Sequence, residues 1–283
     1  MKGVAIVIGY ALQESLRRRV FVIVVLLTAA FLGLFALGSN QAFKEVAESP
    51  IITVVDEQTL TGATLLGLAM FGTLFLGAVL AVFLTISVVR GDAERGLLQP
   101  LVVRPVGREA LLAGRFLAAA GVCALYTAAV FTATAGIVYW AGGWWPDAIV
   151  LPAVQLAGAV VVIAAISIVG SVFLSATANG IAVFMLFGAG LVAGLLGQIG
   201  EALGSETLTD VSRTTSWALP FEALYQDALD AISGESFGLT GQVLQLGPFG
   251  GAQSAGPLLV PWTLAYLAAL ALVGGLAFAR RDL

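Results

Sequence analysis

The chain contains no histidine, one cysteine and two lysines among its 283 residues. Without histidine there is neither an imidazole general base nor a histidine-ligated metal site. The single Cys123 cannot form an intrachain disulfide, and its long apolar surroundings favour an inert, buried side chain over a reactive thiol. Neither Lys2 nor Lys44 follows a glycine-rich loop, which excludes a phosphate-binding GxxxxGK[ST] loop. If the protein uses ATP, another polypeptide must hydrolyse it.

Charged residues are also scarce. Only 11% of the residues are charged, 59% are hydrophobic, and the mean hydropathy is +1.01. A soluble domain is about a quarter charged, and a disordered chain combines low hydrophobicity with high net charge, so both classes are excluded. The composition therefore predicts an integral membrane protein.

Five long intervals of the sequence carry no charge, and together they have room for six membrane-spanning helices of about 20 residues each. Continuous apolar runs do not fit the shorter, alternating strands of a membrane barrel, so we expect an all-α fold. The interval between Asp147 and Glu201 holds two crossings, separated by the polar stretch 175–180. We expect one transmembrane domain over residues 1–283, with spans near 20–38, 63–89, 115–140, 149–174, 181–200 and 257–279.

The distribution of lysine and arginine predicts that both termini face the cytoplasm. In that orientation the cytoplasmic side carries 11 of these residues and the outer side carries two, Lys44 and Arg213. The apolar core of the first span is longer than that of a signal peptide, so we expect a retained anchor. We therefore expect a multi-pass protein of the inner or plasma membrane.

The segment before the first span is too short to cross the membrane. Residues 2–16 are interrupted by Gly3 and Gly9 and are followed by the triple arginine 17–19. This pattern favours an interfacial helix over residues 1–19, held by its apolar face and by arginine contacts with anionic headgroups. The alternative is a positively charged flank that only sets the topology.

Residues 90–114 are expected to form the main cytoplasmic loop. Together with Arg115, this loop combines five arginines and three acids with an apolar cluster at 97–98 and 101–103. An exposed apolar cluster surrounded by charge is typical of a protein contact. The alternative is a loop that lies on the headgroups with its leucines dipped in lipid.

Residues 201–256 are expected to form the longest extracytoplasmic segment. Within it, residues 219–231 have Pro220 near their start and apolar residues at helical spacing, which predicts an amphipathic helix. We expect its acids, Glu222, Asp227 and Asp230, to face water. Cation binding by these carboxylates is the alternative, although the spacing of an oxygen-ligand site is absent.

No ionisable residue lies in the middle of a predicted span. This absence argues against an ion-coupled carrier and against an intramembrane hydrolase. Small residues at Gly190, Gly194, Gly197 and Gly200 are best explained by close helix packing in lipid.

The cytoplasmic loop resembles that of the ABC type-2 transporter permeases. In that family a glutamate, a glycine, a hydrophobic pair, a Pro-x-[Ser/Gly]-Arg turn and a Gly-Lys/Arg step recur in this loop. The matching residues are Glu94, Gly96, Leu97-Leu98, Pro105-Val106-Gly107-Arg108 and Gly114-Arg115. Gly107 stands where serine is common. The layout of the whole chain is also similar, with an interfacial N-terminal helix, six spans and a coupling helix between spans 2 and 3.

The resemblance implies the transmembrane subunit of an ABC exporter. Such a subunit is not itself an enzyme: it dimerises with a second copy or a paralogue and docks separate ATPase subunits, which bind ATP and Mg²⁺. No cofactor or metal is therefore expected on this chain. The docking residues would be Asp92, Glu94, Arg95, Gly96, Leu97, Leu98, Arg104, Pro105, Gly107 and Arg108. The outer helix would act as an external gate through Pro220, Phe221, Leu224 and Tyr225.

Alternative functions remain at this point. The alternative to an exporter permease is a membrane scaffold that passes ATPase motion to an extracytoplasmic protein partner without moving a solute. An intramembrane enzyme lacks candidate catalytic groups, and the acidic outer surface gives no sign of a nucleic-acid partner. The layout is similar to permeases linked to multicopper-enzyme maturation, but lipid, peptide and drug exporters share it, so the sequence does not identify a substrate.

Overall fold

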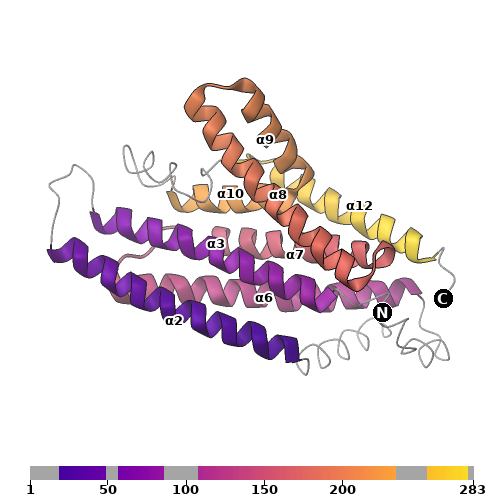
Figure 1. Ribbon diagram of the computed structural model, residues 1–283, viewed down its shortest axis with the longest axis horizontal. Coiled ribbons are helices and arrows are strands. Elements are labelled where there is room, and N and C mark those ends of the chain that lie inside the picture. The colour runs from indigo at the N-terminus through magenta and orange to yellow at the C-terminus, as the bar shows by residue number, and fades with distance from the viewer. Residues whose placement is uncertain (1–18, 49–56, 86–107, 234–253, 280–283) are drawn as a thin grey trace.

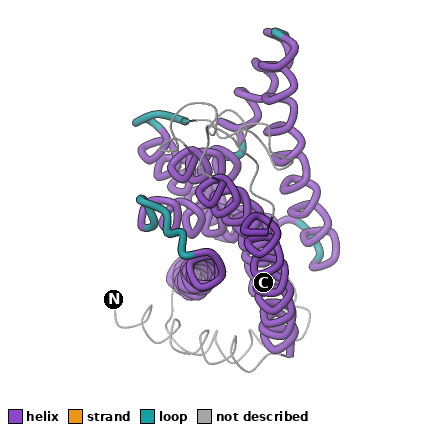
Figure 2. Tube along the Cα trace, turned by 90° about the vertical axis from the view of Figure 1, so that its left-hand side faces the viewer, coloured by secondary structure: helices purple, strands orange, loops and turns teal. Residues whose placement is uncertain are grey.

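The structure is a computed structural model that describes residues 19–48, 57–85, 108–233 and 254–279. Within these ranges every regular element is a helix, and no strand is present (Figure 2). The helices, labelled in Figure 1, are α2 (Arg19–Glu48), α3 (Glu57–Thr85), α6 (Arg108–Gly142), α7 (Val150–Phe173), α8 (Ala176–Leu203), α9 (Glu206–Ala218), α10 (Pro220–Ser233) and α12 (Leu259–Ala279).

Six of these helices are long and apolar enough to cross a membrane. They are α2, α3, α6, α7, α8 and α12, and the most apolar part of each has a mean hydropathy between 1.8 and 2.7. The all-α membrane fold with six spans is therefore confirmed. The interfacial helix expected over 1–19 lies outside the described residues, except for Arg19 at the start of α2.

The break between α7 and α8 is shorter than the polar stretch 175–180 suggested. Only Leu174 and Ser175 separate the two helices, and both have extended backbone dihedrals. Asn179 lies inside α8, where its side-chain amide donates a hydrogen bond to the carbonyl oxygen of Ser167 at 2.9 Å. The polar residue thus links the two helices instead of interrupting them.

The helices α3 and α7 form the centre of the bundle. About two thirds of the most apolar window of each is buried (67% and 61%), against 17% for α2 and for α12. Large apolar side chains are exposed on the peripheral helices, among them Leu34 of α2 at 71% and Leu264 of α12 at 62%. This arrangement fits a bundle that presents its periphery to lipid.

Glycines allow the central helices to approach closely. At Gly77 of α3, an added Cβ atom would lie 2.6 Å from Val160 of α7, and at Gly72 it would lie 2.6 Å from Phe31 of α2. Small residues at such positions let helix backbones pack at short distance in a membrane. Gly77 thus brings α3 close to α7, and Gly72 brings α3 close to α2.

The two ends of the bundle are built from different clusters. At one end Phe43, Trp144 and the glycines 62 and 142 pack together. At the other end Leu112, Ile168, Val172 and Phe278 form a separate apolar cluster. We call the first the outer end and the second the inner end, following the orientation expected from the charges.

Candidate functional site

After α8 the chain turns back into the bundle. Gly204 ends α8 with a positive φ of 63°, a conformation that glycine adopts without strain. The next helix, α9, packs on the last turns of α8, where a Cβ atom added at Gly200 would lie 2.7 Å from the hydroxyl of Thr209. The following helix, α10, then runs alongside the spanning helices (Figure 1).

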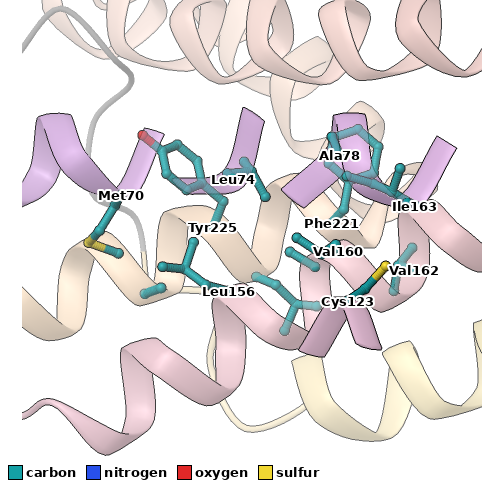
Figure 3. Packing of buried hydrophobic residues seen from close by; sticks show 14 of the residues in the cluster. Met70, Leu74, Ala78, Cys123, Leu156, Val160, Val162, Ile163, Phe221 and Tyr225 are labelled. Atoms are coloured by element: carbon teal, nitrogen blue, oxygen red, sulfur yellow. The ribbon is translucent and has the colours of Figure 1, made fainter. Parts of the chain in front are cut away.

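The first two turns of α10 are buried among spanning helices. The Phe221 ring stacks on Phe187 of α8 with 6.0 Å between ring centroids, and Leu224 lies against Gly158 of α7. Tyr225 is 0% exposed and lies in the core cluster with Leu74 of α3 (Figure 3). The four proposed gate residues, Pro220 included, are therefore all buried, on a helix that packs against α3, α7, α8 and α12.

The expectation that the acids of this helix face water is wrong for Glu222. This carboxyl is 1% exposed, and Gln226 Nε2 donates a hydrogen bond to its Oε1 at 2.8 Å. Burial raises the pKa of the Glu222 carboxyl to about 7, and the Gln226 hydrogen bond acts in the opposite direction. Asp227 and Asp230 are half-buried. The pKa of Asp230 is raised, mainly by burial and to a smaller extent by the charge of Asp227.

Glu222 lies well inside the bundle. An added Cβ atom at Gly194 of α8 would meet Glu222 Oε1 and would lie 2.6 Å from Gln226 Nε2, while one at Gly190 would meet Phe221. At 1.5 Å per residue, these glycines are about 10 Å and about 16 Å from the outer end of the α8 span. Glu222 is not part of a predicted span, but its carboxyl lies between the spanning helices because α10 packs against them.

Further hydrogen bonds connect α9 and α10 to the bundle. Gln155 of α7 donates its side-chain amide to Asp227 Oδ2, and the backbone N–H of Ala255 donates to Asp227 Oδ1 at 2.8 Å. The Trp262 indole of α12 donates to the carbonyl oxygen of Trp217 at 2.8 Å. The outer helices are thus attached to α7 and α12 as well as to α8.

Most of the proposed docking residues lie outside the described part of the chain. Asp92, Glu94, Arg95, Gly96, Leu97, Leu98, Arg104, Pro105 and Gly107 fall in the undescribed range 86–107, and Arg108 is the first residue of α6. Their docking role stays a prediction.

The helices that flank this loop are held at the inner end. The hydroxyl of Thr85, the last residue of α3, is hydrogen-bonded to that of Ser167 of α7 at 2.6 Å. Asn179 of α8 in turn donates to the Ser167 carbonyl oxygen. On the other side of the loop, Leu112 of α6 packs against Ile168 and Phe278. These contacts connect the last residue of α3 with α7 and α8, and the first turns of α6 with α7 and α12.

A family model described as ABC-2 family transporter protein matches residues 6–283. The chain belongs to this family. It is therefore a membrane-spanning permease subunit of an ABC transporter and a multi-pass membrane protein. ABC-2 membership implies an ATPase partner and a typically dimeric arrangement, and these permeases are generally not catalytic themselves. No curated protein matches the chain. The subtype linked to multicopper-enzyme maturation stays a prediction.

The polar residues of the site differ in how far the sequence indicates them. The sequence pattern predicts a water-facing Glu222 and places Asn179 in the break between two spans, and it predicts no role for Gln155 and Gln226. The spacing of Glu222 and Gln226, four residues apart, places them on one face of a helix. A matching signal is present on α8 in Gly190 and Gly194, also four apart: Gly190 leaves room for Phe221, and Gly194 leaves room for Glu222 and Gln226.

Proposed function

We propose that this subunit works as the permease of an exporter in the plasma membrane. It pairs with a second permease copy or a paralogue and docks ATPase subunits, which bind ATP and Mg²⁺, through residues 92–108. The observation that carries this proposal is the position of α8. Near the start of α8, Asn179 donates a hydrogen bond to Ser167 of α7, which is itself bonded to Thr85 at the end of α3. Further along α8, the side chains of α10 pack against Gly190 and Gly194.

The mechanism follows from that connection. Closure of the ATPase subunits displaces the loop between α3 and α6, and the hydrogen bonds at Ser167 pass the displacement to α7 and α8. Tilting of α8 changes its contact with Phe221 and Glu222, so that α10 leaves or rejoins its position. The helix α10 thereby acts as the external gate, with Pro220, Phe221, Leu224 and Tyr225 as its packing face.

The docking assignment is tested by reversing charge in the loop. Glu94→Lys together with Arg108→Glu should abolish both co-purification of the ATPase subunit and stimulation of its ATP hydrolysis. The control is Arg213→Glu, which reverses an exposed charge on α9, and it should leave both readouts unchanged. If the loop variant keeps full co-purification and stimulation, the docking assignment is wrong.

The gate assignment is tested by fixing α10 to α8. In a Cys123→Ser background, cysteines at Phe187 and Phe221 would be joined by a short thiol crosslinker, since the two rings stack at 6.0 Å. Crosslinking should uncouple ATP hydrolysis from the permease, while each single-cysteine variant treated in the same way should not. Unchanged coupling in the crosslinked protein would favour a scaffold that works without a moving outer helix.

A further inference from the structure

Three buried side-chain oxygen atoms on α10 lack hydrogen-bond partners among the described residues: the Tyr225 hydroxyl, Oε2 of Glu222 and Oε1 of Gln226. The last two belong to residues that are 1% and 5% exposed. The same two side chains already share one hydrogen bond, from Gln226 Nε2 to Glu222 Oε1 at 2.8 Å. A buried acceptor without a donor is costly, so two of them side by side call for a physical explanation.

One proton supplies the missing donor for both atoms. If Oε2 of Glu222 carries a proton, its hydroxyl can donate to Oε1 of Gln226 while the Gln226 amide donates to Oε1 of Glu222. The result is a cyclic carboxylic acid–amide pair that has no net charge. An ionised carboxylate would instead place a charge inside the bundle and leave the Gln226 oxygen without a donor.

In the described part of the chain, no other charged group is shown opposite this pair. Among the described residues, α7 has no titratable side chain, α8 has Glu201 near its outer end, α3 has Glu57 at its start and α12 has Tyr266. The α9 helix carries Glu206, Asp210 and Arg213, and Arg213 is exposed. On α10 itself, Asp227 is hydrogen-bonded to Gln155 and Ala255, and Asp230 lies two turns beyond Glu222. The pKa of Tyr225 is raised, mainly by burial and to a smaller extent by the charge of Glu222. The described residues contain no group of three or more side chains placed to hold a metal ion.

The packing around the pair also limits what can bind there. The glycine face of α8 is filled by Glu222 and Gln226, because a single added Cβ atom at Gly194 would collide with both. A solute or a hydrated cation would not fit without moving α10. A proton needs no cavity, so it is the ligand that the closed arrangement can hold.

We propose that Glu222 is a proton-binding site, neutral and paired with Gln226 while α10 is docked on α8, and deprotonated when α10 leaves. This inference rests on the gate function proposed above.

When α10 leaves, the Glu222 O–H bond breaks, the proton passes to water at the outer end, and the carboxylate is hydrated. When α10 returns, the carboxylate takes up a proton again. Acidic conditions outside therefore hold the gate closed, and alkaline conditions favour its opening. Because burial raises the pKa of Glu222 to about 7, the change falls near neutral pH.

The protonation state is measured directly by infrared spectroscopy of the full chain in lipid nanodiscs. We expect a carbonyl band of a protonated carboxylic acid that Glu222→Gln removes, and this band should disappear as the pH is raised through about 7. Asp230→Asn is the matched control, because it removes a half-buried acid from the same helix and should leave the band in place. If Glu222 contributes only a carboxylate band at acidic and neutral pH, the proposal is overturned.

Pairing with Gln226 has its own spectroscopic signature. Gln226→Leu removes the amide that donates to the acid carbonyl, so the Glu222 band should move to higher frequency. An unmoved band would show that the two side chains are not paired, and would contradict the cyclic arrangement.

Release of the proton is tested in the complex with the ATPase subunit. On adding ATP, hydrogen–deuterium exchange in residues 220–233 should rise while the Glu222 acid band falls. Increased exchange with an unchanged acid band would overturn the proton site but leave the gate intact. If exchange itself does not change, it is the gate assignment that fails.

Discussion

Alanine substitution of two glycines on α8 tests the contact between α8 and α10. At Gly190 an added Cβ atom would lie 2.7 Å from Phe221 Cζ and 2.9 Å from Cε2, whereas at Gly188 nothing lies within 4 Å. Both positions are inside the same helix, so the change in backbone preference is the same for both. Any difference between Gly190→Ala and Gly188→Ala therefore reports the contact with α10.

The expected magnitude follows from two opposing effects. Replacing glycine by alanine in a helix interior gains about 0.5–1 kcal/mol. Overpacking a filled core costs about 1–3 kcal/mol, and the Phe221 ring has little room to move because it is 1% exposed and stacked on Phe187. We expect Gly188→Ala to be neutral or stabilising, and Gly190→Ala to be less stable than Gly188→Ala by about 1–3 kcal/mol.

The assay is thermal denaturation of both purified variants and the wild type in the same detergent. Hydrogen–deuterium exchange would locate the effect, and Gly190→Ala should increase exchange in residues 220–233 more than in α6 or α12. Equal stability and equal exchange in the two variants would show that α10 does not occupy this face of α8, and would refute the reasoning.

Three further predictions follow from the same contacts. The pKa of Glu222 is raised from 4.5 to about 7 in the folded protein, so the wild type should lose stability as the pH rises between these values, by at most about 3 kcal/mol. Denaturation of Glu222→Gln should lack this loss, and equal pH dependence in the two proteins would contradict the assignment. Asn179→Leu removes the donor to the Ser167 carbonyl oxygen, and it should reduce ATPase stimulation, whereas Thr132→Val, at an exposed position of α6, should not. Gln155→Leu removes the side-chain donor to Asp227 and leaves only the backbone N–H of Ala255 as its donor. This change should destabilise the protein by about 1–3 kcal/mol in thermal denaturation. Unchanged stability would exclude a structural role for the Gln155–Asp227 bond.

The membrane fold could be predicted from the sequence because hydrophobic length decides it. Apolar runs of about 20 residues leave few alternatives to a spanning helix. The break after Phe173 was harder to predict, because Asn179 and its neighbours look like a turn when read locally. The side-chain NH₂ of Asn179 donates to Ser167 of α7, and this contact exists only once the two helices have packed.

The position of α10 could not be predicted for a similar reason. Its periodicity indicated an amphipathic helix and correctly located Phe221, Leu224 and Tyr225 on a packing face. Periodicity does not tell how deep a helix lies, however, and depth here depends on the reversal of direction at Gly204 and on the path of α9. With α10 buried on most sides, an acid that would face water on a surface helix becomes an interior group.

The most direct test of the central claim is photocrosslinking from the cytoplasmic loop in intact membranes. A photoreactive residue at Leu98 should form an adduct that contains an ABC ATPase subunit, and the same residue at Val211, which is exposed on α9, should not. If position 98 is instead labelled by reagents confined to the outside of the cell, or captures no ATPase while position 211 does, the account of a permease driven through this loop is contradicted.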